Sequence, residues 1–261
     1  MNPTPPASRT EVEDLPAAPA HAAPPSQPAP RRAVVQAKDL TLTSARGTVY
    51  GPVSLHVREG DLVVLQGPQG SGRTSLLLTL AGRMRPDRST RQLTVLGHEL
   101  PRERYAVQKL AAVAGFDAID RLDDSVTVAD TLRERLTWLT PWYRRAPRLT
   151  EQTYRDAASA VFGERHLPAL DTVVWDLDEV DAMLLRITVA MLAQPRLLVV
   201  DDLDQVHDAA RRQLVWDSLA GLAAAGVTVI ASVASAGEVQ AMTWQTSPRV
   251  VRLTTGPQLD A

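Results

Sequence analysis

The sequence predicts an α/β fold in which a mostly parallel sheet carries a helical insert. Short apolar runs such as Leu62–Leu65 and Leu197–Val200 are flanked by turn residues, as is typical of buried parallel strands. Segments with helical periodicity gather between about residues 116 and 192, whereas strand and helix patterns alternate on either side. Alternation at both ends with helices between them indicates one α/β core with a helical subdomain.

The expected elements can be placed in order. Residues 1–32 hold nine of the 19 prolines, mixed with alanine, which predicts a disordered tail before a folded domain at 33–261. A passive extension is favoured for this tail over a docking peptide. Strands are expected at Val34–Leu42, Val53–Val57, Asp61–Gln66, Gln92–Leu96, Leu110–Ala114, Leu197–Val200, Val227–Val233 and Val250–Leu253. Helices are expected from Gly72 to about Gly82 and at Val128–Leu139, Thr150–Phe162, Glu179–Leu192 and Asp208–Ala225.

Composition narrows the classes of function. The formal net charge is −2, so no global basic field points to nucleic acid as a partner. The chain has no cysteine, which excludes disulfides and thiolate metal sites. Its five histidines are scattered without ligand spacing. No apolar run approaches the length of about 18 residues that a membrane span needs, so at a membrane something other than a span of its own must hold this chain.

A glycine-rich turn between a strand and a helix is the most informative segment. It has the pattern of a phosphate-binding loop, a P-loop, apart from an arginine where such loops carry lysine. Its glycines let successive N–H groups point at phosphate oxygens, and the helix N-terminus adds partial positive charge. The predicted phosphate-binding residues are Gly67, Pro68, Gln69, Gly70, Ser71, Gly72, Arg73, Thr74 and Ser75.

A phosphate loop needs a metal partner, and the sequence offers one. The hydroxyl of Thr74 is placed to ligate Mg²⁺, and Asp201 ends a buried strand, where an acidic residue usually holds this ion. Asp202 follows directly, where a carboxylate could activate the attacking water. The predicted metal-binding residues are thus Thr74 and Asp201, and the predicted catalytic residue is Asp202.

Residues 33–253 resemble the ATP-binding cassette family, the nucleotide-binding subunits of ABC transporters. Gly67–Ser75 matches the family's Walker A motif, Leu197–Asp201 its Walker B motif, and Val53–Asp61 its hairpin into Walker A. Asp208 stands where the family has the aspartate of its D-loop. The resemblance implies a P-loop NTPase core, an N-terminal antiparallel β subdomain and binding of ATP with Mg²⁺.

Other family motifs are missing, so the chain resembles a degenerate member. Residues 177–181 read Leu-Asp-Glu-Val-Asp in place of the signature LSGGQ, which in the family binds the γ-phosphate held by the opposite subunit. Carboxylates there would face that phosphate. Gly115, Phe116 and Asp117 stand where the Q-loop glutamine is expected, and Ala234 replaces the switch histidine.

Three further differences concern the nucleotide itself. Asp202 replaces the family's catalytic glutamate. The adenine-stacking aromatic expected near Thr43 or Ser44 is absent, and Tyr50 is the nearby candidate to replace it. Arg73 is broader than lysine, so the exchange is not conservative, although only two of the 28 cationic residues of this chain are lysine.

The resulting expectation is a cytoplasmic ATP-binding subunit that lies against a membrane permease, forms a homodimer or a heterodimer, and hydrolyses ATP slowly. One alternative is a pseudo-ATPase whose nucleotide state gates an interaction, paired with a competent cassette. Another is a P-loop phosphotransferase or GTPase, but the chain contains no guanine-reading NKxD motif.

The expected helical insert also interleaves aromatic and basic residues. Trp138, Trp142 and Tyr143 lie close to Arg144 and Arg145. They could form a surface that docks on the permease, or they could be partly buried with the arginines in solvent.

Overall fold

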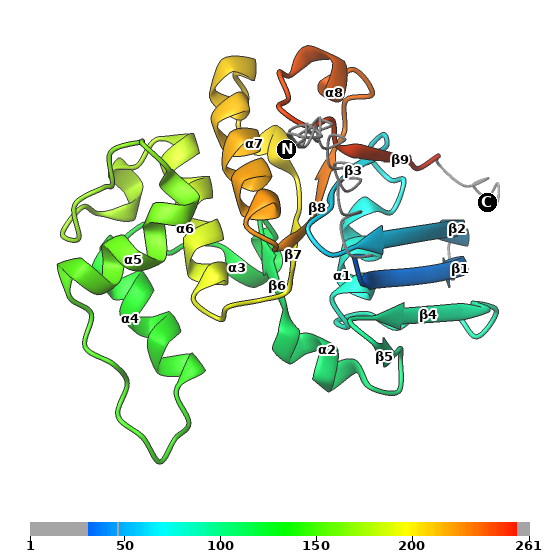
Figure 1. The fold of residues 1–261 in the computed structure, drawn as a ribbon, viewed down its shortest axis with the longest axis horizontal. Helices are drawn as coiled ribbons and strands as arrows, with labels where there is room; N and C mark the ends of the chain where they lie inside the picture. The colour runs from blue at the N-terminus through cyan, green and yellow to red at the C-terminus, as the bar shows by residue number, and fades with distance from the viewer. Residues whose placement is uncertain (1–30, 46, 255–261) are drawn as a thin grey trace, which may run out of the picture. The chain divides into compact units, whose positions relative to one another are not determined.

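The computed structural model describes residues 31–45 and 47–254 (Figure 1). The tail expected at residues 1–32 lies outside the described residues apart from its last two. The domain boundary at residue 33 therefore stays a prediction, as does the end of the domain.

An antiparallel sheet forms the N-terminal part of the described chain. Its strands β1 (Ala33–Ser44), β2 (Gly47–Arg58), β4 (Gln92–Val95) and β5 (His98–Glu99) lie in the order β2-β1-β4-β5. β1 pairs with β2 in a long hairpin whose register places Val35 opposite Val57 and Leu42 opposite Tyr50. The antiparallel β subdomain is thus confirmed.

A five-stranded parallel sheet carries the functional site. Its strands β3 (Leu62–Gln66), β6 (Ala111–Ala114), β7 (Leu197–Val200), β8 (Thr228–Val233) and β9 (Arg249–Arg252) lie in the order β6-β7-β8-β3-β9. β3 and β7 both pair with β8, so their carboxyl ends meet at one edge of the sheet. This edge brings the expected phosphate loop and the expected metal-binding aspartate together.

Helices cover both faces of the parallel sheet. α1 (Arg73–Leu80) contacts β2, β7 and β8, and α2 (Arg104–Leu110) precedes β6. The helical insert contains α3 (Asp117–Asp120), α4 (Val128–Leu139), α5 (Glu151–Phe162), the short 3₁₀ helix η1 (Val174–Asp176) and α6 (Glu179–Met191). The 3₁₀ helix η2 (Leu203–Gln205), α7 (Ala209–Ala224) and α8 (Glu238–Ala241) follow.

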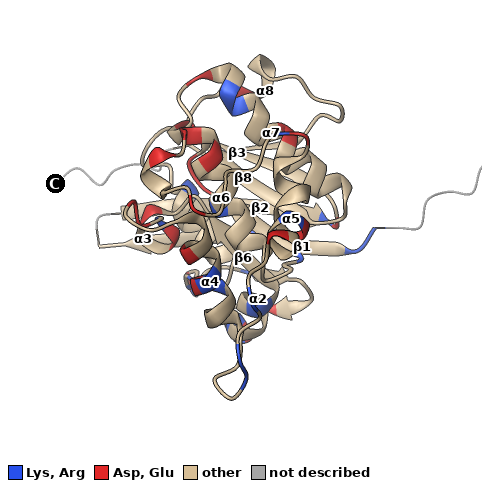
Figure 2. Cartoon of the chain, turned by 90° about the vertical axis from the view of Figure 1, so that its left-hand side faces the viewer, with Lys and Arg blue, Asp and Glu red and all other residues tan. Residues whose placement is uncertain are grey.

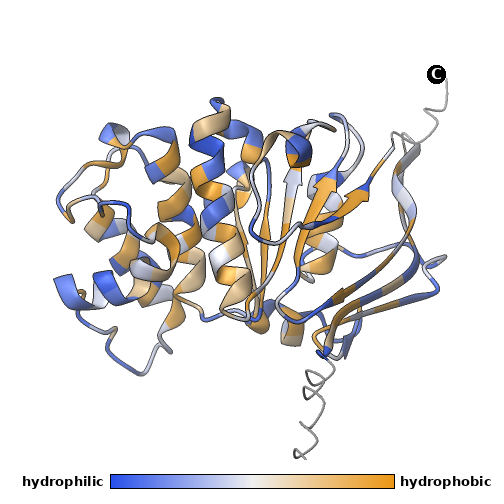
Figure 3. Ribbon diagram, turned by 45° about the horizontal axis from the view of Figure 1, so that its top comes forward, coloured by the Kyte–Doolittle hydropathy of each residue, from blue (hydrophilic) through white to orange (hydrophobic). Residues whose placement is uncertain are grey.

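The core divides along the parallel sheet into two clusters, one on each face. Leu62 and Val64 of β3 belong to the cluster that includes α4 to α7, whereas Val63 and Leu65 pack with α1 and the antiparallel sheet. Because both of their faces are buried, β3, β6, β7 and β8 are mostly apolar, which Figure 3 shows as orange ribbon at the centre of the domain, whereas the edge strand β9 begins and ends with an exposed arginine. Within residues 31–45 and 47–254, no helix is long and apolar enough to cross a membrane.

Candidate functional site

The turn between β3 and α1 presents N–H groups that the fold does not use. Gly72 precedes the helix with a left-handed φ of 82°, and Arg73 is the first helical residue. Across the described part of the chain, no acceptor is bound by the backbone N–H groups of Gly70, Gly72, Arg73, Thr74 and Ser75. Free N–H groups at a helix N-terminus attract anions, so this turn can hold phosphate oxygens.

Close packing explains why this turn needs glycine at residue 72. A Cβ atom on Gly72 would lie 2.3 Å from the backbone oxygen of Val49 and 2.8 Å from Cβ of Tyr50. Gly70 also has a positive φ, 83°, but a Cβ atom there would meet nothing within 4 Å. Gly72 is therefore required by both space and conformation, whereas Gly70 is required by conformation alone.

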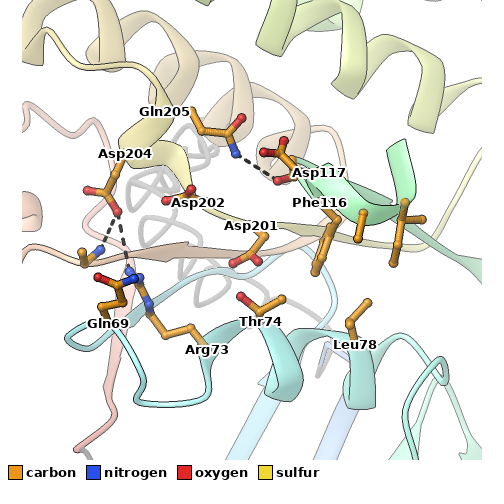
Figure 4. Close-up of a pocket in the computed structure, with 14 residues that line it drawn as sticks. Gln69, Arg73, Thr74, Leu78, Phe116, Asp117, Asp201, Asp202, Asp204 and Gln205 are labelled. Carbon is orange, nitrogen blue, oxygen red and sulfur yellow. Dashed lines mark hydrogen bonds and ion pairs between the residues drawn. The ribbon is translucent and has the colours of Figure 1, made fainter. Parts of the chain in front are cut away.

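The turn opens into a cavity of about 550 Å³ (Figure 4). Figure 4 shows Thr74 on α1 and Asp201 at the end of β7 with their side chains facing each other across it. Of the predicted phosphate-binding residues, Gln69, Arg73 and Thr74 line the cavity, together with the predicted metal ligand Asp201 and the predicted catalytic residue Asp202. The cavity is lined by Gln69, Arg73, Thr74, Leu78, Gly115, Phe116, Asp117, Ala118, Ile119, Asp201, Asp202, Asp204, Gln205 and Ala234.

Asp201 is buried and held in place by a serine of the neighbouring strand. Its Oδ1 accepts a hydrogen bond of 2.5 Å from Oγ of Ser232, which also accepts one of 3.0 Å from the N–H of Asp202. The other carboxylate oxygen and the hydroxyl of Thr74 have no partner in the described chain. Two protein oxygens with room for water and phosphate suit Mg²⁺, which keeps most of its ligands as water or phosphate oxygen.

Arg73 lies in the cavity against a carboxylate that the sequence analysis did not single out. Its Nη1 is 3.6 Å from Oδ2 of Asp204, and this buried nitrogen makes no hydrogen bond to any described residue. The same Asp204 oxygen accepts a hydrogen bond of 2.6 Å from the N–H of Ala234, the residue at the switch position. The sequence signal that could have identified Asp204 as a site residue is its position three residues after Asp201.

The neighbouring carboxylates of the cavity affect the pKa of Asp202. Burial raises the pKa of Asp202, the neighbouring Asp204 and Asp201 raise it further, and Arg73 opposes the shift. Asp202 also has a left-handed backbone, with φ 50° and ψ 57°. An excess of carboxylates over cations makes the site suitable for a divalent cation and poor for a phosphate without one.

The segment at the Q-loop position is held by a buried arginine of α6. Nε and Nη2 of Arg186 bond both carboxylate oxygens of Asp120, at 3.2 and 2.9 Å, and its Nη1 donates to Oε1 of Gln205 at 2.8 Å. Gln205 in turn donates to the carbonyl oxygen of Gly115 at 3.0 Å. This network, which the sequence analysis missed, joins α6, the segment after β6 and η2 beside the cavity.

Each carboxylate of the segment at the signature position is engaged within the chain. Arg165 binds Asp178 at 2.9 Å and Asp181 at 2.6 Å, and Asp178 also caps α6 by accepting from the N–H of Asp181. Glu179 accepts from the ring of His207 at 3.1 Å and lies 3.5 Å from Arg211. These carboxylates therefore stabilise the start of α6 and its contact with the segment before α7.

The structure corrects the expectation that Tyr50 replaces the adenine-stacking aromatic. Tyr50 is 1% exposed, and its hydroxyl bonds Oγ1 of Thr79 at 2.7 Å. Burial raises its pKa to about 12. A ring packed inside the core cannot stack on a base, so this prediction was wrong.

Comparisons with known proteins agree with this geometry. The family model described as "ABC transporter" matches residues 50–204. The Nod factor export ATP-binding protein I of Mesorhizobium japonicum (strain LMG 29417 / CECT 9101 / MAFF 303099) is 29% identical over 183 residues, which cover 70% of this chain and 50% of that protein. Its namesake from Burkholderia pseudomallei (strain 1710b) is 30% identical over 190 residues, which cover 70% and 56%. The chain thus spans about half the length of these relatives.

Solved structures show the same fold. A nucleotide-free ATP-binding cassette from an ABC transporter superposes with a TM-score of 0.66 at 15% identity, over 88% of this chain and 90% of that one. The ATP-binding subunit of an ABC transporter gives a TM-score of 0.61 at 19% identity, over 87% and 90%. The α/β fold with a P-loop core, a parallel sheet and an antiparallel β subdomain is therefore confirmed.

Proposed function

Because the chain belongs to the ABC transporter family, we propose that it is the ATP-binding subunit of a bacterial transporter. It binds Mg-ATP at residues 67–75 and acts from the cytoplasmic side on a membrane permease. The observation that carries the proposal is the set of free N–H groups at Gly70 and at Gly72 to Ser75, in a turn whose Arg73 and Thr74 line the same cavity as Asp201. The relatives are named for export of Nod factor, and we extend only their ATP-binding role to this chain.

Each group at the site has a proposed task. The N–H groups of Gly70 to Ser75 bind phosphate oxygens, and Arg73 leaves Asp204 to contact the β- or γ-phosphate. Thr74 and Asp201 hold Mg²⁺, which offsets the negative charge of phosphate and carboxylates. Asp202 orients or deprotonates the attacking water, and its raised pKa makes its carboxylate a stronger base than an ordinary aspartate.

We propose that hydrolysis by this chain is slow, which makes it a degenerate member of its family. No glutamine follows β6 and no histidine ends β8, where Ala234 stands instead. Asp202 is one methylene shorter than glutamate, so its carboxylate reaches less far toward a γ-phosphate. Each missing group would remove positioning or charge stabilisation of the transition state.

A second candidate function is that of a nucleotide-gated pseudo-ATPase paired with a competent cassette. The specific observation in its favour is the signature segment, whose Asp178, Glu179 and Asp181 are committed to Arg165, His207 and Arg211. A segment that is acidic and internally paired offers a phosphate on an opposite subunit nothing to bind. This chain would then present its own loop to the intact signature of a different cassette.

Calorimetric titration of the purified chain with Mg-ATP tests nucleotide binding, and phosphate release from the same sample tests hydrolysis. Saturable binding that weakens in Arg73→Ala supports the proposed site. A dissociation constant weaker than millimolar that Arg73→Ala leaves unchanged would refute it. Turnover that disappears in Asp202→Ala indicates a working ATPase, whereas binding without turnover favours the pseudo-ATPase.

A further inference from the structure

The connection between α4 and α5 exposes aromatic side chains that the nucleotide site does not use. The N–H of Arg144 donates to the carbonyl oxygen of Pro141 at 2.8 Å, so Trp142 and Tyr143 form the corner of a turn. Trp142 is 95% exposed and Tyr143 is 68% exposed. Their rings meet edge to face with centroids 5.9 Å apart. The corner thus presents apolar surface to the outside, which overturns the alternative that these residues are partly buried.

The same segment is basic and has no counter-charge. Residues 138–150 contain Arg144, Arg145 and Arg148 and no Asp or Glu. None of these arginines forms an ion pair with any residue that the structure describes. The guanidinium carbon of Arg144 lies 5.9 Å from the ring centroid of Tyr143, so one cation is held beside the aromatic corner.

The segment also protrudes. Figure 1 shows the connection extending away from α4 and α5, and Figure 2 shows blue ribbon close to its end. A convex tip of this kind cannot enclose a small ligand, so its chemistry is that of a surface contact. We call residues 141–148 the aromatic-basic tip.

We propose that the aromatic-basic tip docks on the headgroup region of an anionic lipid bilayer. Tryptophan and tyrosine favour this region because one part of each ring system is apolar and another part is polar. The Nε1 of Trp142 and the hydroxyl of Tyr143 bond to nothing in residues 31–45 and 47–254, so both are free for headgroups and water. Arginines without carboxylate partners are attracted to acidic lipids.

This contact is distinct from permease docking and from nucleotide binding. It requires only lipid, so it can be tested on the full chain without ATP. The result of that test does not depend on whether the proposed function is correct. A membrane protein as the partner of the tip is the competing outcome. Protein-free vesicles separate the two, because they offer headgroups and no protein surface.

The experiment is flotation of the full chain with vesicles of phosphatidylcholine alone or mixed with phosphatidylglycerol. We expect flotation with the anionic vesicles only, and its loss in high salt. Each arginine near an anionic surface contributes about a fivefold change in partitioning, so Arg144→Gln with Arg145→Gln lowers partitioning roughly thirtyfold. Trp142→Ala with Tyr143→Ala lowers it as well, because the apolar contact is lost.

Matched variants elsewhere control for general effects of charge and hydrophobicity. Trp175 is 76% exposed on η1, and the side chain of Arg102 is 82% exposed before α2. We expect Trp175→Ala and Arg102→Gln to float like the unaltered chain. Absence of flotation with anionic vesicles, or flotation that the tip variants leave unchanged, overturns the proposal. Binding to native membrane vesicles that is lost after protease treatment, with none to pure lipid, overturns it too and assigns the tip to a membrane protein.

Discussion

Asp202 combines three properties that a purely structural residue seldom has. It lies beside two other carboxylates, its pKa is raised by burial, and its backbone is left-handed. A raised pKa means that the folded state favours the protonated carboxyl, so ionisation at neutral pH reduces stability. Such a cost is expected where charge is arranged for a ligand rather than for the fold alone.

We expect Asp202→Asn to stabilise the chain in the absence of nucleotide at neutral pH. Asparagine tolerates the left-handed backbone and removes both a partly buried charge and its repulsion from Asp204 and Asp201, a gain on the order of 0.5 kcal/mol at this partly exposed position. The sign follows from the raised pKa: the gain is largest above the pKa of Asp202 in the folded state and shrinks as the pH falls through it. Urea unfolding across this pH range measures the effect. A gain that is equally large in acid would contradict the explanation.

Gly72 and Gly70 provide a matched pair for the phosphate loop. Gly72→Ala brings Cβ to 2.3 Å from a backbone oxygen, so we expect a loss of about 3 kcal/mol, since the left-handed strain and the clash both contribute. Gly70→Ala has the strain without the clash, and about 1 kcal/mol is expected. Thermal unfolding of both variants checks the order. Equal losses would show that the contact with Val49 relaxes freely.

Individual residues were predictable where a motif fixes their surroundings. Gln69, Arg73 and Thr74 of the phosphate loop line one cavity with Asp201, because parallel strands end at the same edge of a sheet. Asp204 and Arg186 were missed, because their partners are far apart in sequence or come from an insert of unknown orientation. Tyr50 was wrongly placed near adenine because spacing along a strand does not show which face is buried.

Among the elements, α6 is tied to the site by Arg186, which is 8% exposed. We expect Arg186→Met to reduce the free energy of unfolding by about 3 kcal/mol, because it leaves Asp120 without its bidentate partner in a partly buried position. Arg133→Met is the control, because Arg133 pairs with Asp130 on an exposed helix face. We expect the loss of that ion pair to reduce the free energy of unfolding by less than about 0.5 kcal/mol.

A second variant separates lost charge pairing from lost packing. Asp120→Asn in the Arg186→Met background removes the unpaired charge while an amide oxygen can still accept from the N–H of Gly115. We expect it to recover part of the stability, measured by urea unfolding. No recovery would mean that Arg186 acts through packing of its side chain rather than through charge.

The positions of helices were predictable where capping residues and apolar periodicity indicate the same helix ends. α4 and α5 begin after Thr127 and Thr150, each of which caps its helix in a reciprocal pair of hydrogen bonds. α7 is followed by Gly226 with φ 100°, the expected left-handed residue. α2 was missed because it has a single fully buried residue, Val107, and therefore little apolar periodicity.

At the scale of the whole molecule, the sheet architecture was predictable and the links between its parts were not. The strands of the parallel sheet are visible as apolar runs, whereas their order β6-β7-β8-β3-β9 is known only from the structure. The pairing of acidic residues at the signature position with Arg165 and His207 depends on how the insert packs. No pattern in the sequence specifies that packing.

This pairing leads to a prediction about assembly. In the family that the chain belongs to, a signature segment binds the γ-phosphate held by the opposite subunit, so two copies of a cassette close around ATP. Here Asp178, Glu179 and Asp181 would face that phosphate, and carboxylates repel a group of the same charge. We therefore expect the chain to remain monomeric with saturating Mg-ATP, as measured by sedimentation velocity on the Asp202→Asn variant, in which we expect turnover to be suppressed.

Conversion of residues 177–181 to Leu-Ser-Gly-Gly-Gln is the matched test. Serine at position 178 can still cap α6 when the carboxylates are removed, although glycine at position 180 also deletes the buried side chain of Val180 and lowers stability. We expect this variant to sediment as a dimer with Mg-ATP and as a monomer without it. Dimerisation of the chain with its natural signature segment would instead support a homodimer, and the acidic segment would then need cations from the opposite copy.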